Sequence, residues 1–336
     1  MRLKQIAVAA AALCFASWAA RAEEVNLLFG TTLPAQVHLN VRVLHPWAER
    51  INQQGKGIVH IDVRDGSEIA NLGNFYSRVQ DDVIQISWGL QSAIGGKFPR
   101  TAVGGLPFEV EKAEIGSAAL WRVYKSGLFN AEYDTVQPLY MITFPPSGIH
   151  YAKQPKTLEN LNGLKLATGS KVGADTIERL GGTPLSMITS DYYTALQRGM
   201  VDAVLVQWTA FQPFKLQDVT FYHLETKLGG ATGMVFMAKK KYDALPAAVR
   251  KILDDNSGEA ESRVYGKFWD DVDNEGREMV KALGDKHKII QQSPAIAAKW
   301  RKAVAPVIDD WVKATPDGAK VLAAFRAETA KVTAGQ

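Results

Sequence analysis

Cysteine is almost absent from this sequence of 336 residues, and the single one is Cys14. Cys14 lies in an N-terminal segment that we expect to be removed, so the mature chain would contain no thiol. Disulfides, thiol catalysis and thiolate metal sites are therefore excluded. The preceding residues 11–13 (Ala-Ala-Leu) fit a lipoprotein attachment site poorly.

A large excess of charge of one sign is also missing. The chain has 39 Lys and Arg and 35 Asp and Glu, and removal of Arg2, Lys4 and Arg21 leaves 36 basic and 35 acidic residues. A near-neutral chain without a basic run has no electrostatic surface for nucleic acid, so we expect no such partner. Hydrophobic residues make up 46% of the sequence, enough for one large domain or two ordinary ones.

Only one long hydrophobic run is present, at the N-terminus, where MRLKQ is followed by IAVAAAALCFASWAA. A basic stretch before about fifteen apolar residues is typical of a secretory signal peptide, and the run is shorter than the ~20 residues of a membrane span. Ala20 and Ala22 form an A-x-A site. We therefore expect a signal peptide at 1–22, cleavage after Ala22 and a periplasmic protein.

Sequence motifs for chemistry are missing as well. There is no glycine-rich dinucleotide or phosphate loop and no Gly-x-Ser-x-Gly elbow, and none of the six histidines has a metal-ligand spacing. We expect no cofactor, no metal and no enzymatic activity. A catalytic carboxylate pair stays open, because the sequence does not reveal which carboxylates come together.

What the sequence does contain is an alternation of strand and helix patterns. Period-two or continuous apolar runs predict strands at 25–30, 57–65, 84–89, 163–168 and 201–208. Helical spacing predicts helices at 38–54, 71–83, about 171–180 and 190–200, and a helical region from Pro246 to the end. This order predicts an α/β fold in two lobes with a helical C-terminal tail.

One segment is much more specific than these patterns. Residues 190–202 read SDYYTALQRGMVD, and LNGLK precedes them at 161–165. With FGTTLP, LGNFYSRVQDD and GLPF upstream, this string resembles the solute-binding proteins of tripartite ATP-independent periplasmic (TRAP) transporters, of the dicarboxylate-receptor (DctP) type. The resemblance covers nearly the whole mature chain.

The resemblance implies a two-lobe periplasmic binding protein fold with a hinge and a long lobe-spanning helix. Lobe I would comprise 23–146 plus about 234–280, and lobe II 147–233 plus about 281–330, with hinge segments at Phe144–Ser147 and Met234–Met237. A small organic solute would bind between the lobes and favour their closure, and the closed protein would deliver it to a TRAP membrane permease. We expect the receptor itself to be a monomer.

The sequence departs from the family where the ligand carboxylate is usually held. The arginine that follows the G-L-K string is replaced by Ala167, a second arginine position matches His150, and a ligand-contacting asparagine position matches Val206. Two explanations stay open. The ligand is neutral or aromatic, or it is a carboxylate held by another donor, with His150 first and Arg42, Arg78 or Arg100 as relocated clamps.

Aromatic residues gather at the expected strand ends, where their flat faces suit a ring-shaped ligand. The residues expected at the ligand are Trp88, His150, Ala167, Trp208, Phe29, Tyr192, Gly89 and Tyr151. Core packing is the alternative role for each aromatic side chain. Two other functions also stay open: a sensory receptor subunit and a periplasmic enzyme on the same scaffold.

Overall fold

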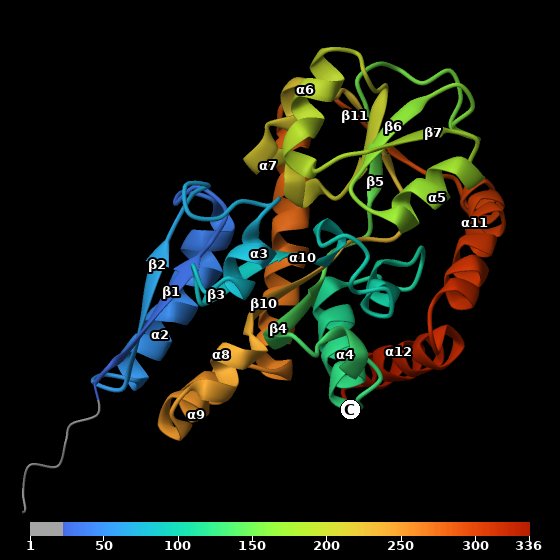
Figure 1. Cartoon of the computed structure of the whole chain (residues 1–336). Helices are drawn as coiled ribbons and strands as arrows, with labels where there is room; N and C mark the ends of the chain where they lie inside the picture. The colour runs from blue at the N-terminus through green and yellow to red at the C-terminus, as the bar shows by residue number, and fades with distance from the viewer. Residues whose placement is uncertain (1–22) are drawn as a thin grey trace, which may run out of the picture.

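The computed structural model describes residues 23–336, so the expected signal peptide and its cleavage site lie outside the described residues. The chain forms two separate mixed sheets with helices around them (Figure 1). This is the α/β two-lobe architecture expected from the sequence. Within residues 23–336, no helix is both long enough and apolar enough to span a membrane.

The first lobe is built on a five-stranded sheet in the order β2-β1-β3-β10-β4. Its strands are β1 (Val25–Gly30), β2 (Val59–Arg64), β3 (Ile86–Leu90), β4 (Val136–Thr143) and β10 (Thr232–Ala238). Alternate side chains of these strands enter two different cores: Phe29 and Val235 lie in one, Leu28 and Phe236 in the other. Helices therefore cover both faces of this sheet.

Those helices are drawn from distant parts of the chain. They are a π-helical turn (Asn40–Leu44) that runs into α2 (His45–Gln54), then α3 (Phe75–Gln80), α4 (Ala113–Lys125), α8 (Lys239–Ala244) and α9 (Ala247–Asp255). The expected helices at 38–54 and 71–83 are thus present, the second in shortened form. Asn71 and Asn74 form a turn in which Asn74 Oδ1 accepts from the Asn71 N–H, and α3 begins only after it.

The second lobe is built on a six-stranded sheet in the order β11-β9-β5-β8-β6-β7. Its strands are β5 (Gly148–Tyr151), β6 (Lys165–Thr168), β7 (Thr183–Ser186), β8 (Ala203–Val206), β9 (Tyr222–Glu225) and β11 (Lys288–Gln291), and its helices are α5 (Lys171–Arg179), α6 (Tyr192–Gln197) and α7 (Phe211–Phe214). The region after Pro246 is therefore not helical throughout, because β11 pairs in parallel with β9.

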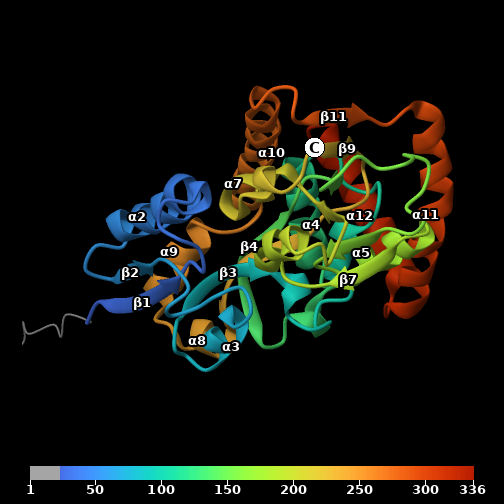
Figure 2. The ribbon, with the colours of Figure 1, turned by 90° about the horizontal axis from the view of Figure 1, so that it is seen from above.

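Two long helices, α10 and α11, tie the lobes together, and a third, α12, follows them. Helix α10 (Glu259–Ala282) is the expected lobe-spanning helix: Tyr265 and Trp269 pack in the first lobe, and Val280 packs in the second. Helix α11 (Pro294–Ala314) lies on the side of the molecule away from β1 and α2, as Figure 2 shows. It leads into α12 (Gly318–Thr333).

Helix α12 packs on a different lobe from the one expected, because the sequence analysis placed residues 281–330 in lobe II. It packs against α4, and Val321 and Phe325 share a core with first-lobe side chains. The reason lies in α11, whose Trp300 is buried in the second lobe and whose Trp311 is buried in the first. The C-terminal tail thus begins on one lobe and ends on the other.

Two short segments cross between the sheets. Residues 144–147 lead from β4 to β5, which is where the first hinge segment was expected. The second crossing is at 226–231, between β9 and β10, and not at Met234–Met237, which are buried strand residues paired on both sides. The two crossings bond to each other, because the Phe144 N–H donates to Ala231 O at 2.9 Å.

Candidate functional site: a cavity between the two lobes

A cavity of about 920 Å³, part of it open to solvent, lies where the two crossings meet the lobes. The crossings contribute Phe144, Ser147, Leu228, Gly230 and Ala231 to its lining. Gly230 is required there, because a Cβ atom would lie 2.9 Å from Phe144 O and 3.0 Å from Pro145 O. The floor of the cavity is therefore the same structure that connects the lobes.

The first lobe and α10 provide an aromatic wall. The rings of Phe144 and Trp269 lie 4.5 Å apart between centroids, and the ring of His38 lies 5.9 Å from that of Trp269. Trp88 is fixed nearby because its indole N–H donates to Thr31 O. All four of these rings line the cavity and are at most 9% exposed.

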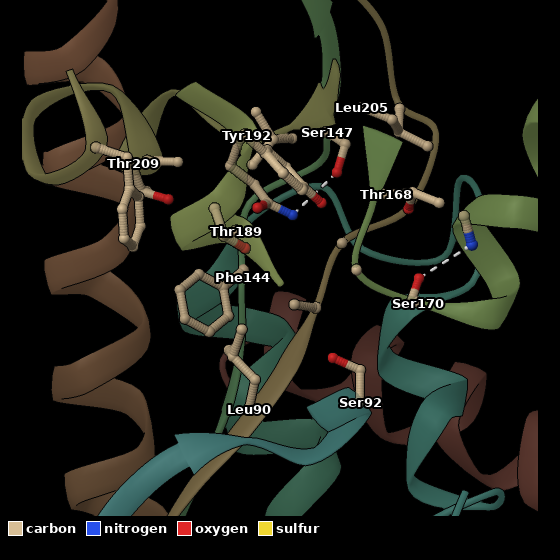
Figure 3. A pocket seen from close by; sticks show the side chains of 18 of the residues that line it. Leu90, Ser92, Phe144, Ser147, Thr168, Ser170, Thr189, Tyr192, Leu205 and Thr209 are labelled. Atoms are coloured by element: carbon tan, nitrogen blue, oxygen red, sulfur yellow. Dashed lines mark hydrogen bonds between the residues drawn. The ribbon is translucent and has the colours of Figure 1, made fainter. Parts of the chain in front are cut away.

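The second lobe provides hydroxyl groups and the beginning of a helix. Gly169, Ser170 and Gly173 line the cavity at the N-terminus of α5, where Ser170 Oγ accepts from the Gly173 N–H at 3.0 Å. A Cβ on Gly169 would lie 3.5 Å from the Tyr192 hydroxyl, which places that hydroxyl beside the helix N-terminus. Figure 3 shows Thr168, Ser170, Thr189 and Tyr192 above the cavity, and Leu90 and Ser92 below it.

Charged side chains do not line the cavity in the described part of the chain. The lining there contains no Arg, Lys, Asp or Glu, and His38 is its one side chain that titrates near neutral pH. Burial lowers the pKa of His38, and its Nδ1 lies 2.9 Å from Gln212 Oε1. Any charge on a ligand must therefore meet hydroxyl groups, backbone N–H groups and the dipole of α5.

Two of the eight residues expected at the ligand line the cavity: Trp88 and Tyr192. Val206, the position matched to the family's asparagine, also lines it. Phe29 instead packs edge-on against Trp47 in the first core, with ring centroids 5.8 Å apart. Tyr151 is buried in a core of the second lobe.

Gly89 and Ala167 occupy strands beside the cavity. Gly89 faces away from it, because a Cβ there would lie 2.3 Å from the Phe75 ring. Ala167 is fully buried in a cluster with Tyr192 and Val206, both of which line the cavity. The small side chain at 167 thus lies behind two lining residues.

His150 does not line the cavity, and both of its ring nitrogens are hydrogen-bonded within the protein. Its Nε2–H donates to Val206 O at 3.0 Å, which leaves Nδ1 to accept from His223 Nδ1–H at 3.1 Å. Burial lowers the pKa of His150 to about 3, so it is neutral. Neither ring nitrogen is free for a ligand, so His150 as placed cannot replace the arginine.

Trp208 packs over the histidines and not into the cavity. Its ring lies 4.6 Å from that of His150 and 4.7 Å from that of Phe211, between centroids. Trp208 begins a short helical turn, Trp208–Ala210, that packs directly on α10. The contact is close, because a Cβ on Gly276 of α10 would lie 2.5 Å from Trp208 O. The next residue, Thr209, lines the cavity in its place.

The three arginines considered as relocated clamps do not line the cavity. Arg42 pairs with Glu275 at 2.7 Å, and Arg100 pairs with Asp317 at 3.1 Å. Arg78 lies on α3, which covers a face of the first sheet. Reasoning from the sequence missed His38, Trp269 and the Ser and Thr residues of the lining, because isolated residues of these types carry no motif.

The fold and the cavity together define a class: a two-lobed receptor that encloses a small solute between lobes joined by crossing segments. Residues 29–314 match the family described as bacterial extracellular solute-binding protein, family 7, the DctP family. The chain belongs to this family. Its members are solute-binding receptors, as the resemblance at 161–202 indicated.

Individual relatives and solved structures are similar to this chain at modest sequence identity. The chain is 26% identical over 322 residues to a Comamonas testosteroni protein named outer membrane transporter protein TsaT, covering 93% of this chain and 94% of that protein. A TRAP solute-binding protein from Rhodoferax ferrireducens, in complex with copurified benzoate, is 26% identical, with a TM-score of 0.84 and coverage of 91% and 98%.

A marine metagenome TRAP protein described as specific for aromatic acid ligands has a similar fold. Its complex with 3-hydroxybenzoate has a TM-score of 0.85 and 25% identity, and the match covers 92% of this chain and 99% of that one. A Bordetella bronchiseptica protein with bound mandelate has a TM-score of 0.83 at 23% identity, with coverage of 92% and 99%, and supports the fold.

Proposed function

We propose that this protein is the periplasmic receptor for an aromatic monocarboxylate, which it binds between its lobes and delivers to a TRAP permease. The observation that carries the proposal is the division of the cavity into two unlike sides. Phe144, Trp88 and Trp269 form an aromatic surface on one side, and the N-terminus of α5 with nearby hydroxyls forms a polar surface on the other. Two relatives at 25–26% identity bind benzoate or 3-hydroxybenzoate.

In this proposal the carboxylate lies at the N-terminus of α5. Backbone N–H groups and the helix dipole favour an anion there, and the hydroxyls of Ser170 and Tyr192 are close by. Burial raises the pKa of Tyr192, so its hydroxyl stays protonated as a donor. No carboxylate side chain of residues 23–336 lines the cavity to repel the ligand.

The ring would then lie against the aromatic wall. Burying the ring contributes about 2–3 kcal/mol from apolar area alone. This combines the two explanations left open by the missing arginine: the ligand is aromatic, and its carboxylate is held by neutral donors in place of a guanidinium. A dicarboxylate would bring a second charge to the aromatic side, where no cation meets it.

Isothermal titration of residues 23–336 with benzoate, benzamide and succinate tests the proposal. We expect benzoate to bind, and benzamide and succinate to bind at least about tenfold more weakly, because each loses either the charge or the ring. Preferential binding of succinate would overturn the proposal. Release of unchanged benzoate in stoichiometric amount would separate a receptor from an enzyme.

We further propose how the receptor is exported and in what form it acts. The N-terminal segment is a signal peptide cleaved after Ala22, and the mature chain acts as a monomer. Adjacent genes for a small and a large membrane subunit would support transport, whereas a neighbouring membrane kinase would support a sensory role.

A further inference from the structure

One side-chain hydrogen bond joins the two lobes at the edge of the cavity. His38 belongs to the first lobe, and its Nδ1 lies 2.9 Å from Oε1 of Gln212 on α7 of the second lobe. His38 lines the cavity, and so do Pro213 and Phe214, which follow Gln212 in the chain. Gln212 itself is exposed, so the bond lies where the cavity meets solvent.

The direction of this bond is fixed by its chemistry. Oε1 of Gln212 can only accept, so Nδ1 of His38 carries the hydrogen. Burial lowers the pKa of His38, so the neutral ring has that one hydrogen only. The bond therefore requires the Nδ1–H form of the neutral ring, and this form can be measured directly.

The first-lobe side of the bond is held in place by its surroundings. Asn40 Nδ2 donates to Leu33 O at 2.9 Å and to Pro34 O at 3.1 Å, which fixes the loop that precedes His38. The His38 ring packs edge-on against that of Trp269 on α10, with centroids 5.9 Å apart. A donor that is already oriented loses little freedom when its acceptor arrives, so the bond can form readily as the lobes approach.

We infer that His38 and Gln212 form a latch: their hydrogen bond holds the lobes in the closed arrangement and must break before a bound solute can leave. This inference goes beyond the proposed ligand, because the latch joins two groups of the protein itself. A contact that exists only in the closed arrangement slows release by the same factor by which it favours closure. His38 and Gln212 act here as positioning residues.

Gln212→Ala tests the latch, because it removes the acceptor at an exposed position. The release rate of benzoate from residues 23–336 is measured by stopped-flow tryptophan fluorescence, since Trp88 and Trp269 line the cavity. We expect release to become about three- to tenfold faster, the range that one net hydrogen bond supplies. Gln197→Ala, at the exposed end of α6, is the matched control and should release benzoate like the unmodified protein. Equal release rates for Gln212→Ala and the control would overturn the inference.

A double-mutant cycle shows whether the two residues act as a pair. His38→Phe keeps an aromatic ring beside Trp269 and removes the Nδ1–H donor. In that background Gln212→Ala has no latch left to break, so we expect it to change the release rate by less than about twofold. A full three- to tenfold effect of Gln212→Ala in the His38→Phe protein would show that Gln212 acts through another contact, and the latch would be wrong.

Spectroscopy of the unliganded protein separates this inference from the proposed function. Nitrogen-15 NMR of the His38 ring should show the hydrogen on Nδ1, and Gln212→Ala should shift the signals toward the Nε2–H form. Identical His38 signals in the two proteins would overturn the latch without any ligand. If benzoate fails to bind, the aromatic-acid function fails and these spectra still decide the latch. If benzoate binds and leaves every variant at the same rate, the function stands and the latch is wrong.

Discussion

Under the proposed function, single residues decide how the receptor would hold an anion without a cation in its cavity. Tyr192 is the clearest case, because its ring is buried in the second lobe and its hydroxyl lies beside the N-terminus of α5. A hydroxyl that donates to a charged group contributes about 1.5–3 kcal/mol, close to what one contact of an arginine clamp would supply. Several such donors together can replace the guanidinium.

Tyr192→Phe removes this hydroxyl and keeps the ring. We expect benzoate affinity to fall about tenfold or more, with the melting temperature of the unliganded protein nearly unchanged. Titration calorimetry measures the affinity, and Tyr193→Phe, which changes the adjacent residue outside the lining, is the control. Equal losses in both variants would mean that Tyr192 does not contact the carboxylate.

Ala167→Arg introduces the arginine that the resemblance to the family implies for this position. Ala167 is fully buried in a cluster with Tyr192 and Val206, so the new side chain would overpack the cluster and bury a charge without a partner. We expect the free energy of unfolding to fall by about 3 kcal/mol or more, measured by urea denaturation. Lys165→Arg on the same strand is the control, and a stable Ala167→Arg protein with tighter benzoate binding would contradict the placement.

Much of the site chemistry could be anticipated at this scale, but not its geometry. Trp88 and Tyr192 were expected at the ligand and line the cavity, whereas Phe29 is equally aromatic and lies in a core. The sequence does not reveal that both ring nitrogens of His150 are already bonded. Those bonds involve Val206 and His223, which approach only through the strand order of the second sheet.

At the scale of elements, α10 links the cavity to both lobes, because its side chains pack in each of them. Asp273 on this helix is half-buried, with its Oδ1 atom covered, near the turn that holds Trp208 and Thr209. Desolvation raises the pKa of Asp273 to about 7, partly offset by the backbone N–H groups of that turn. Asp270 raises this pKa further and Arg277 lowers it. Thr209 lines the cavity, so the carboxyl lies directly behind the site.

The raised pKa makes a prediction about pH. A carboxyl whose pKa is higher in the folded state contributes stability that is fully present below its unfolded value of 3.8 and is lost as pH rises through about 7. Compared with Asp273→Asn, the unmodified protein should lose up to about 4 kcal/mol of unfolding free energy between pH 4 and pH 8. Urea denaturation across this range measures it.

The control for this prediction is Asp271→Asn, at a surface position where the carboxylate pairs with Lys267. That variant should follow the pH profile of the unmodified protein closely. A profile for Asp273→Asn that is parallel to the unmodified one would show that the Asp273 carboxyl is ionised without cost in the folded state.

Element order could be predicted well from the sequence, and element partners less well. The second crossing was expected at Met234–Met237 and lies at 226–231, because MVFM is a strand buried on both faces and the glycines before it, Gly229 and Gly230, make the connection. Helix α12 could not be assigned to a lobe from its own sequence. Its partner α4 is about 200 residues earlier in the chain. Amphipathic spacing shows which face of a helix is apolar, but not which element that face packs against.

The whole molecule is expected to close around its ligand, because the proposed contacts for the carboxylate and the ring belong to different lobes. A ligand stabilises closure only by binding the closed state better than the open one. At a concentration of 100 times its dissociation constant, benzoate should raise the free energy of unfolding by about 2.7 kcal/mol, which is visible as a higher melting temperature. Small-angle scattering should show a smaller radius of gyration at the same saturation.

Gly230→Val tests whether the crossings carry this motion. The new side chain would press against Phe144 O and Pro145 O and force the two crossings apart. We expect the variant to bind benzoate at least about tenfold more weakly and to show little or no decrease in radius of gyration at saturation. Ala298→Val, at an exposed position of α11, is the control and should behave like the unmodified protein. A Gly230→Val protein that closes normally would show that the lobes move about another connection, with α10 and the α11–α12 turn as the remaining links between them.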